Sequence, residues 1–210
     1  MAIYPLGFLN VEGSDRDKQI IRESLLQIDQ LGTGYWCGYS FTWMACLAAR
    51  IGESGRVLSM LDLYLRGFIS RNGFHLNGDY KNLGLSRFKY RPFTLEGNFA
   101  AAQAVHEMLL QSWGGTIRIF PTVVEDWQDV AFSGLRAEGA FLVSAQRENG
   151  CTVRVRIETE RDNLLKLKNP FGRCPVRWSG KEPEKLGNDC YRCRLNAGEY
   201  LEGEVLNSSA

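Results

Sequence analysis

Apolar residues recur at helical spacing through the first half of the chain. In residues 15–31 they fall at Ile20, Ile21, Leu25, Leu26 and Ile28, which predicts an amphipathic helix. Ser14 or Asp15 can cap the start of this helix, and Gly32 with Gly34 ends it. The same pattern predicts three further helices, over residues 40–51, 54–69 and 97–112.

The pattern changes to alternation after residue 115. Residues 140–145 and 151–157 alternate apolar and polar positions, and Glu148-Asn149-Gly150 between them predicts a tight hairpin turn. Other segments with strand character are 116–120, 163–167, 176–178, 190–194 and 199–206.

Helices followed by strands in separate blocks indicate the α+β class. We therefore expect a helical part over residues 1–114 and a C-terminal antiparallel β module over residues 115–210. The short strands of that module predict a β-sandwich.

Composition narrows the functional classes. The chain has 210 residues, of which 44% are hydrophobic and 23% charged, as in ordinary globular domains. The formal net charge of +1 predicts no nucleic-acid partner, and no apolar run is long enough to predict a membrane partner. The first eight residues lack the basic and apolar regions of a secretory signal.

The six cysteines form no clear framework. Cys190 and Cys193 make a CxxC pair, but a zinc site needs further ligands, and His75 and His106 are far away in sequence. The two cysteines also point to opposite faces if they lie in a strand. Structural cysteines are therefore favoured over a metal or redox role, and no cofactor and no metal are expected.

The segment 91–99 carries the most informative chemistry. It places Glu96, Gly97 and Asn98 directly before a helix, with Phe93 and Phe99 on either side. Aromatic rings can stack on a sugar, an amide can bind hydroxyls, and an acid can move protons, so the segment suits carbohydrate chemistry. The alternative is that Glu96 only stabilises the helix dipole.

The polar segment before it is a second candidate. His75, Asn77 and Asp79 can contact sugar hydroxyls, because a loop of this length in a compact domain is often functional. The alternative is a turn-rich loop without a ligand. Trp36 is either a stacking platform for a sugar or a core residue, and Arg91 pairs with an acid or lines a cavity.

The order of motifs resembles a known family. It consists of the segment GTGYWCGYSFTW at residues 32–43, the segment PFTLEGNF at 92–99, and a Gly-Gly strand start at residue 114. Residues 1–160 in this order are similar to the C-terminal part of the α-L-fucosidases of glycoside hydrolase family 95 and their six-hairpin relatives.

The resemblance implies an (α/α)6 barrel followed by a β module, so that this chain holds part of the toroid and belongs to a longer bacterial glycosidase. Glu96 stands where the family has the base-side aspartate of an Asp-Gly-Asn-Phe-Gly motif. Ala100 replaces the last glycine of that motif, and Tyr90 replaces a histidine. The general acid would lie in the region before residue 1.

The resemblance leads us to expect an inverting, α-L-fucosidase-like glycoside hydrolase acting on oligosaccharides or polysaccharides. Glu96 is the expected catalytic residue; the expected substrate-binding residues are Trp36, His75, Asn77, Asp79, Tyr90, Arg91, Phe93 and Asn98. The alternative is a non-catalytic carbohydrate-binding or structural fragment. Expected partners are a carbohydrate ligand, the rest of the parent chain and a second copy through exposed apolar helix faces. The compartment is periplasmic or extracellular if the parent is secreted, and otherwise cytoplasmic.

Overall fold

The computed structural model describes residues 1–187 and 189–206. The chain divides into two compact units, Met1–Met108 and Leu109–Ala210. In the described part of the chain, four α-helices belong to the first unit, and the last of them ends one residue beyond it, at Leu109. Antiparallel sheets make up the second unit. This confirms the α+β class. The domain boundary expected after residue 114 stays a prediction. The boundary between the two compact units falls after Met108.

Caps mark the start of α1 and the ends of α1 and α2. Ser14 and Asp17 form a reciprocal capping box at the start of α1, and the Gly32 N–H closes its end. Gly52 ends α2 in the left-handed conformation that glycine adopts without strain. The bounds are α1 Asp15–Leu31, α2 Gly38–Ile51, α3 Ser54–Phe68 and α4 Glu96–Leu109.

The core of the helical unit is centred on α2, which is buried nearly all round. Ile21 and Leu25 of α1 pack with Met44 and Leu47 of α2. On its other side α2 places Phe41 against Tyr64 and Phe68 of α3. Within the described residues, no helix is long and apolar enough to cross a membrane.

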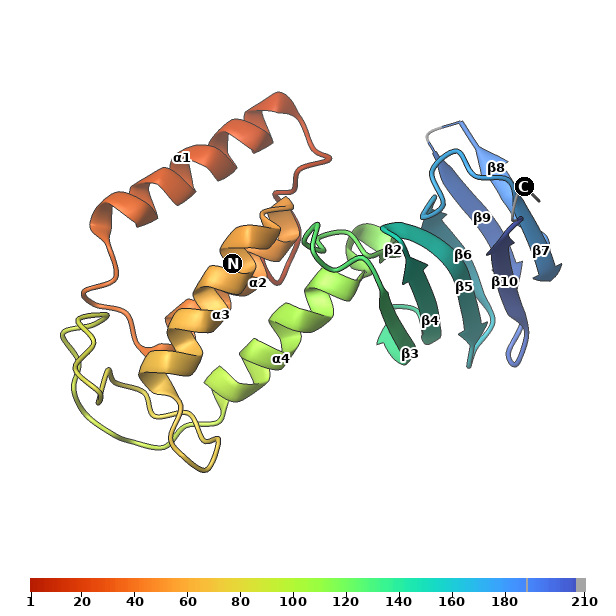
Figure 1. Ribbon diagram of the computed structural model, residues 1–210. Helices are drawn as coiled ribbons and strands as arrows, with labels where there is room; N and C mark the ends of the chain where they lie inside the picture. Colours follow the sequence, from red (N-terminus) through yellow and green to blue (C-terminus); the bar gives the residue numbers. More distant parts are fainter. Residues whose placement is uncertain (188, 207–210) are drawn as a thin grey trace. The chain divides into compact units, whose positions relative to one another are not determined.

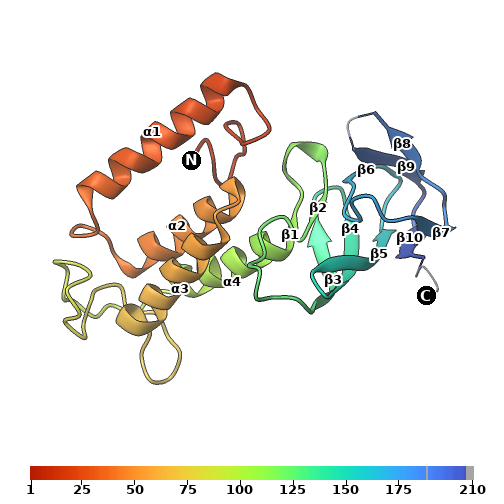
Figure 2. The same cartoon turned by 45° about the horizontal axis from the view of Figure 1, so that its top comes forward.

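The connection between α3 and α4 is the only long one in the described part of the helical unit, and we call it the 69–95 loop. Figures 1 and 2 both show it in yellow and yellow-green at the end of the unit where α3 stops and α4 starts. It holds most of the residues that the sequence predicts for the site.

The fourth helix is shorter than predicted. It ends at Leu109 instead of continuing to residue 112, because Leu110 and Gln111 form β1, which pairs antiparallel with β2, Arg118–Ile119. Gly114 and Gly115 both have positive φ between the two strands, and this lets the chain reverse within a few residues.

The β unit contains two larger antiparallel sheets, ordered β3-β4-β5-β10-β7 and β6-β9-β8. Their strands are β3 Val130–Ala137, β4 Phe141–Glu148, β5 Cys151–Thr159, β6 Asn163–Lys168, β7 Val176–Gly180, β8 Glu184–Leu186, β9 Cys190–Leu195 and β10 Tyr200–Val205. Both sheets contribute to one apolar core, in which Val155 and Ile157 of β5 share a cluster with Leu165 and Leu195.

The β4–β5 hairpin agrees with the sequence pattern. Asn149 and Gly150 both have positive φ, as a tight hairpin turn requires. The strands β3 and β8 were not predicted. β3 carries a register shift between Phe132 and Leu135, with Gly134 at positive φ, and this irregularity hides the alternation that marks a strand.

Candidate functional site

The 69–95 loop is fastened to the helices by its backbone. The Leu76 N–H donates to the Phe68 carbonyl at 2.7 Å, and the Asn77 carbonyl accepts from the N–H of Gly38 at 2.9 Å. Leu76 also forms an isolated β-bridge with Phe93. These bonds connect the loop to the end of α3 and the start of α2, so its side chains are displayed from fixed backbone positions.

Asp79 holds the middle of the loop. Its side chain is fully buried, and its carboxylate accepts hydrogen bonds from the N–H groups of Leu83 and Leu85 and from the Lys89 ammonium, each at 3.0 Å. Burial opposes ionisation of the carboxyl, but these hydrogen bonds and the Lys89 charge prevail and lower the pKa of Asp79. All the contacts that Asp79 shows are therefore internal to the loop.

Asn98 connects the loop to α4. Its amide oxygen accepts from the His75 N–H at 2.8 Å, and its amide nitrogen donates to the Gly73 carbonyl at 2.9 Å. One side chain of the first helical turn thus satisfies two backbone groups of the loop. The amide that was expected to bind sugar hydroxyls is engaged by the protein itself.

His75 lies at the centre of this arrangement and is fully buried. Its Nδ1 lies 2.8 Å from the Thr94 hydroxyl. Two glycines make room for its ring, because a Cβ on Gly38 would overlap Nε2 and a Cβ on Gly97 would overlap Nδ1. The ring therefore fits between the first turns of α2 and α4.

The charge state of His75 is set by competing effects. Burial lowers the pKa of its imidazole, and the nearby Glu96 charge and hydrogen bonding by Thr94 only partly oppose this. His75 is therefore neutral at pH 7. Its Nε2 and the neighbouring Tyr64 hydroxyl are both buried without a hydrogen-bond partner among the described residues. Burial and the Glu96 charge raise the pKa of Tyr64.

Glu96 is the first residue of α4, and its side chain is exposed. Within residues 1–187 and 189–206 no hydrogen bond or ion pair engages its carboxylate. Its charge lies at the positive end of the helix dipole and acts on His75 and Tyr64. The Glu96 carboxylate thus faces solvent, whereas the next two residues, Gly97 and Asn98, are held by their contacts with His75.

Exposed aromatic rings lie along the same loop. Phe93 is 52% exposed and meets Phe74 edge-on, with ring centroids 4.8 Å apart. Tyr90 is 45% exposed and packs on Phe88 at 5.5 Å. Asn77 is half-buried and donates to the Tyr90 hydroxyl at 3.5 Å. Of the predicted substrate-binding residues, Tyr90 and Phe93 therefore offer ring surface to solvent.

Arg91 and Trp36, the other two predicted substrate-binding residues, each pack against a different aromatic ring. Arg91 is exposed, and its guanidinium lies 5.4 Å from the centre of the Tyr80 ring. Trp36 is half-buried, meets Phe41 edge-on at 5.1 Å and lines a small hollow together with Tyr39 and Trp43. Trp36 thus combines core packing with one accessible face.

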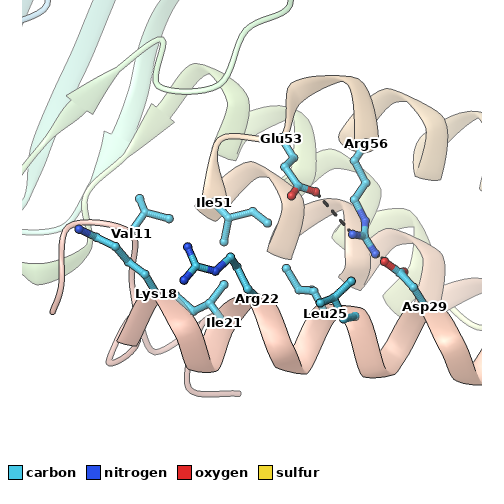
Figure 3. Close-up of a pocket in the computed structure, with 10 residues that line it drawn as sticks. Val11, Lys18, Ile21, Arg22, Leu25, Asp29, Ile51, Glu53 and Arg56 are labelled. Atoms are coloured by element: carbon cyan, nitrogen blue, oxygen red, sulfur yellow. Dashed lines mark hydrogen bonds and ion pairs between the residues drawn. The ribbon is translucent and has the colours of Figure 1, made fainter. Parts of the chain in front are cut away.

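A separate cavity of about 460 Å³ lies on the helical unit between α1 and the start of α3. Figure 3 shows Ile21 and Leu25 along its floor and Arg56 at its wall, bonded to Asp29 and Glu53. None of the predicted site residues lines it. Asp29 and Glu53 in the cavity wall both pair with Arg56, so none of these three side chains is an obvious catalytic group.

Among the described residues, no group of three or more His, Cys, Asp or Glu side chains is arranged to hold a metal ion. All six cysteines are free. Cys190 and Cys193 are both buried in β9, and burial raises the pKa of the Cys193 thiol. A raised pKa disfavours the thiolate that redox and metal chemistry need.

The structure brings Asn98 together with His75, and Asn77 together with Tyr90. His75 and Asp79 are buried and Asn77 and Asn98 are half-buried, whereas the exposed site residues are Tyr90, Arg91, Phe93 and Glu96. Three residues that enclose His75 were not predicted from sequence, namely Gly38, Gly97 and Thr94. A glycine in the first turn of two helices was the available signal, since glycine disfavours helices and allows close approach of another group.

Comparison with known proteins finds a family likeness in the C-terminal part of the chain. Residues 111–199 match the family model of the C-terminal domain of glycoside hydrolase family 95. The chain resembles the C-terminal part of a family 95 glycoside hydrolase. The matched residues follow Glu96 in the sequence, so this match concerns the β unit.

A curated relative extends the likeness into the helical unit. Alpha-L-fucosidase 2 of Arabidopsis thaliana is 28% identical over 161 residues, which make up 76% of this chain and 18% of that protein. The chain thus spans less than a fifth of the length of this relative.

Two solved structures also match. One is a family 39 glycoside hydrolase from Bacteroides cellulosilyticus WH2, at 14% identity and a TM-score of 0.29, covering 76% of this chain and 30% of that one. The other is a GH127 β-L-arabinofuranosidase from Geobacillus stearothermophilus T6, at 12% identity and a TM-score of 0.29, covering 80% and 31%. Scores this low establish no shared fold.

Proposed function

We propose that this chain is the C-terminal portion of an inverting, α-L-fucosidase-like glycoside hydrolase that acts on oligosaccharides or polysaccharides. The likeness to the family 95 C-terminal domain and to a plant alpha-L-fucosidase supports the glycosidase class. In this proposal the helical unit forms part of an α/α toroid and the β unit packs as a sandwich. The rest of the parent chain then completes the active site.

Glu96 is the proposed catalytic base. In inverting hydrolysis one carboxylate removes a proton from water while the water attacks the anomeric carbon, and a second carboxylic acid protonates the leaving oxygen. The two carboxyl groups lie roughly 6.5–9.5 Å apart, which leaves room for the water. The acid would come from another part of the parent protein.

The single observation that carries this role is the setting of Glu96. Its carboxylate is exposed and free of protein partners within the described residues, while Gly97 and Asn98 behind it are fixed against His75. A group that transfers protons needs both access to water and a defined position. Phe93 and Tyr90, which lie close to Glu96 in the sequence, have exposed rings whose apolar faces can stack on a sugar.

Removing the proton-accepting oxygen tests this role. Glu96→Gln keeps the size of the side chain and removes its basicity, so turnover of fucosylated oligosaccharides should fall by roughly 10²- to 10⁴-fold. Turnover is measured in the protein at its native length, by quantifying released fucose. Glu53→Gln is the matched control, because Glu53 is another exposed glutamate next to a helix start.

Retained turnover in Glu96→Gln would remove Glu96 from the mechanism. An equal loss in Glu53→Gln would show that the effect comes from general damage. Circular dichroism and the melting temperature of each variant separate folding from chemistry.

The second candidate is carbohydrate binding without hydrolysis. It is favoured by the paired exposed rings of Phe74 and Phe93, which can stack on a sugar whether or not a base is present. Under this candidate Glu96→Gln leaves glycan affinity unchanged and the native-length protein shows no turnover at all.

A further inference from the structure

The 69–95 loop and the last turn of α3 carry an unusual concentration of positive charge. Residues 66–92 contain six cationic side chains and one acidic side chain, although the whole chain has 25 Lys and Arg against 24 Asp and Glu. The six are Arg66, Arg71, Lys81, Arg87, Lys89 and Arg91. The only acid is Asp79.

The excess of positive charge is larger at the surface than in the sequence, because the one acidic side chain is buried. All six cations are exposed, whereas Asp79 is fully buried and compensates only Lys89. Outside the segment, Asp62 of α3 pairs with Arg66 at 2.8 Å. Within residues 1–187 and 189–206, the other four cations form no ion pair. Several positive charges therefore face solvent without a protein counter-charge.

Three of the cations lie against aromatic rings. The Arg91 guanidinium and the Lys81 ammonium each lie 5.4 Å from the centre of the Tyr80 ring. The Arg87 guanidinium lies 4.8 Å from the centre of the Tyr35 ring and donates to its hydroxyl at 2.7 Å. Phe88 extends this aromatic surface, because its ring contacts both Tyr35 and Tyr90.

Backbone bonds keep this surface in place. The N–H groups of Asn77, Gly78 and Asp79 donate to the carbonyls of Pro92, Tyr90 and Phe88 respectively, at 3.1, 3.2 and 2.8 Å. Lys81 also donates to the Arg66 carbonyl at 2.7 Å. The cations and rings thus lie on a loop that is held by hydrogen bonds, and this limits the conformational entropy lost when a ligand binds.

We propose that this surface, formed by Lys81, Arg87, Lys89 and Arg91 with Tyr35, Phe88 and Tyr90, binds an acidic polysaccharide whose uronic acid residues carry carboxylates. A guanidinium matches a planar carboxylate with two parallel hydrogen bonds, and an aromatic ring stacks on the apolar face of the sugar. A chain of uronic acid units presents both features at every sugar. This inference rests on the proposed carbohydrate function and names its substrate class.

Charge complementarity also attracts single-stranded nucleic acid, which binds to cations interleaved with aromatic rings. The near-neutral charge of the whole chain and its likeness to glycosidases favour the glycan. The two ligands can be separated directly in the test.

The test uses polygalacturonate and the same polymer after methyl esterification, which keeps the sugar backbone and removes its charge. Affinity is measured by isothermal titration calorimetry with the native-length protein at two salt concentrations. We expect binding of the acidic polymer to be at least tenfold tighter than binding of the ester, and to weaken as salt rises. Equal affinity for both polymers, or tighter binding of an oligo(dT) strand, would overturn the proposal.

Matched variants locate the binding surface. Arg87→Gln combined with Arg91→Gln removes two exposed loop cations that lie against aromatic rings and should weaken binding of polygalacturonate at least tenfold. Arg173→Gln combined with Lys185→Gln removes two exposed cations of the β unit and should change it less than twofold. Equal effects of the two pairs would show that only overall charge matters, against the proposal. Unchanged melting temperatures confirm that each pair folds.

Glu96→Gln separates this inference from the proposed function. Binding of polygalacturonate by Glu96→Gln without hydrolysis supports the surface even if the catalytic role fails. Hydrolysis of neutral fucosylated glycans without any preference for the acidic polymer would remove the acidic substrate and leave the proposed function standing.

Discussion

At the scale of single residues, the candidate site depends on how His75 is enclosed. His75, Glu96 and Asn98 stand out in the sequence by their types and their place before a helix. His75 and Asn98 were expected to contact a ligand, whereas their observed contacts are with Thr94, Gly73 and each other. Which hydrogen bonds a polar side chain makes depends on residues distant in sequence, and these are not visible in a local motif.

The enclosure of His75 predicts that Gly97 does not tolerate a methyl group. In Gly97→Ala the new Cβ would overlap the His75 ring, so the unfolding free energy should fall by about 1–3 kcal/mol. Gly55→Ala is the control, because Gly55 also lies in a helix and has open space around its Cβ position. It should be neutral or stabilise by up to about 1 kcal/mol, since alanine favours helices.

Urea denaturation followed by circular dichroism measures both variants. A Gly97→Ala protein as stable as the wild type would show that the ring of His75 is not held as tightly as these contacts indicate.

At the scale of elements, the helices, the hairpin and the presence of a long loop were predictable from the sequence, and the contacts within that loop were not. Caps and periodicity are local, so α1 was predicted with the bounds Asp15–Leu31 that it has. The predicted end of α4 was wrong, because Leu110 and Gln111 pair with β2, a contact that helical periodicity does not reveal. The order of the 69–95 loop depends on the buried Asp79, which the sequence predicted as a substrate-binding residue and whose observed hydrogen bonds lie within the loop.

Asp79 makes the stability of the loop depend on pH. Its pKa is lower in the folded protein than in the unfolded chain, so its stabilising effect is complete above the unfolded value of about 3.9 and is lost as pH falls through the folded value. Asp79→Asn should therefore destabilise by about 2–3 kcal/mol at pH 6 and by less at pH 2, which lies below the unfolded value.

Urea midpoints of the wild type and the variant at both pH values provide the measurement. Asp62→Asn is the control, because Asp62 forms an exposed ion pair with Arg66 and should change stability by less than about 1 kcal/mol. A cost of Asp79→Asn that stays the same at both pH values would contradict the ionised, hydrogen-bonded carboxylate.

At the scale of the whole molecule, the two units carry different kinds of evidence. The β unit matches the family 95 C-terminal domain over residues 111–199, and the helical unit holds the candidate site. The order of motifs along the chain already indicates this combination, because the segment containing Glu96 lies just before the β strands. The excess of cations in residues 66–92 is also visible in the sequence, whereas access to Glu96, the burial of His75 and the burial of Asp79 depend on the fold.

In the proposed mechanism, Glu96 activates a water molecule that attacks the sugar directly. The measurement that tests this most directly is proton NMR of the sugar as it is first released from an α-L-fucoside by the native-length protein. The mechanism predicts that β-L-fucose appears first and then equilibrates, because direct attack by water inverts the anomeric carbon. Initial release of α-L-fucose, or no release at all, would contradict it.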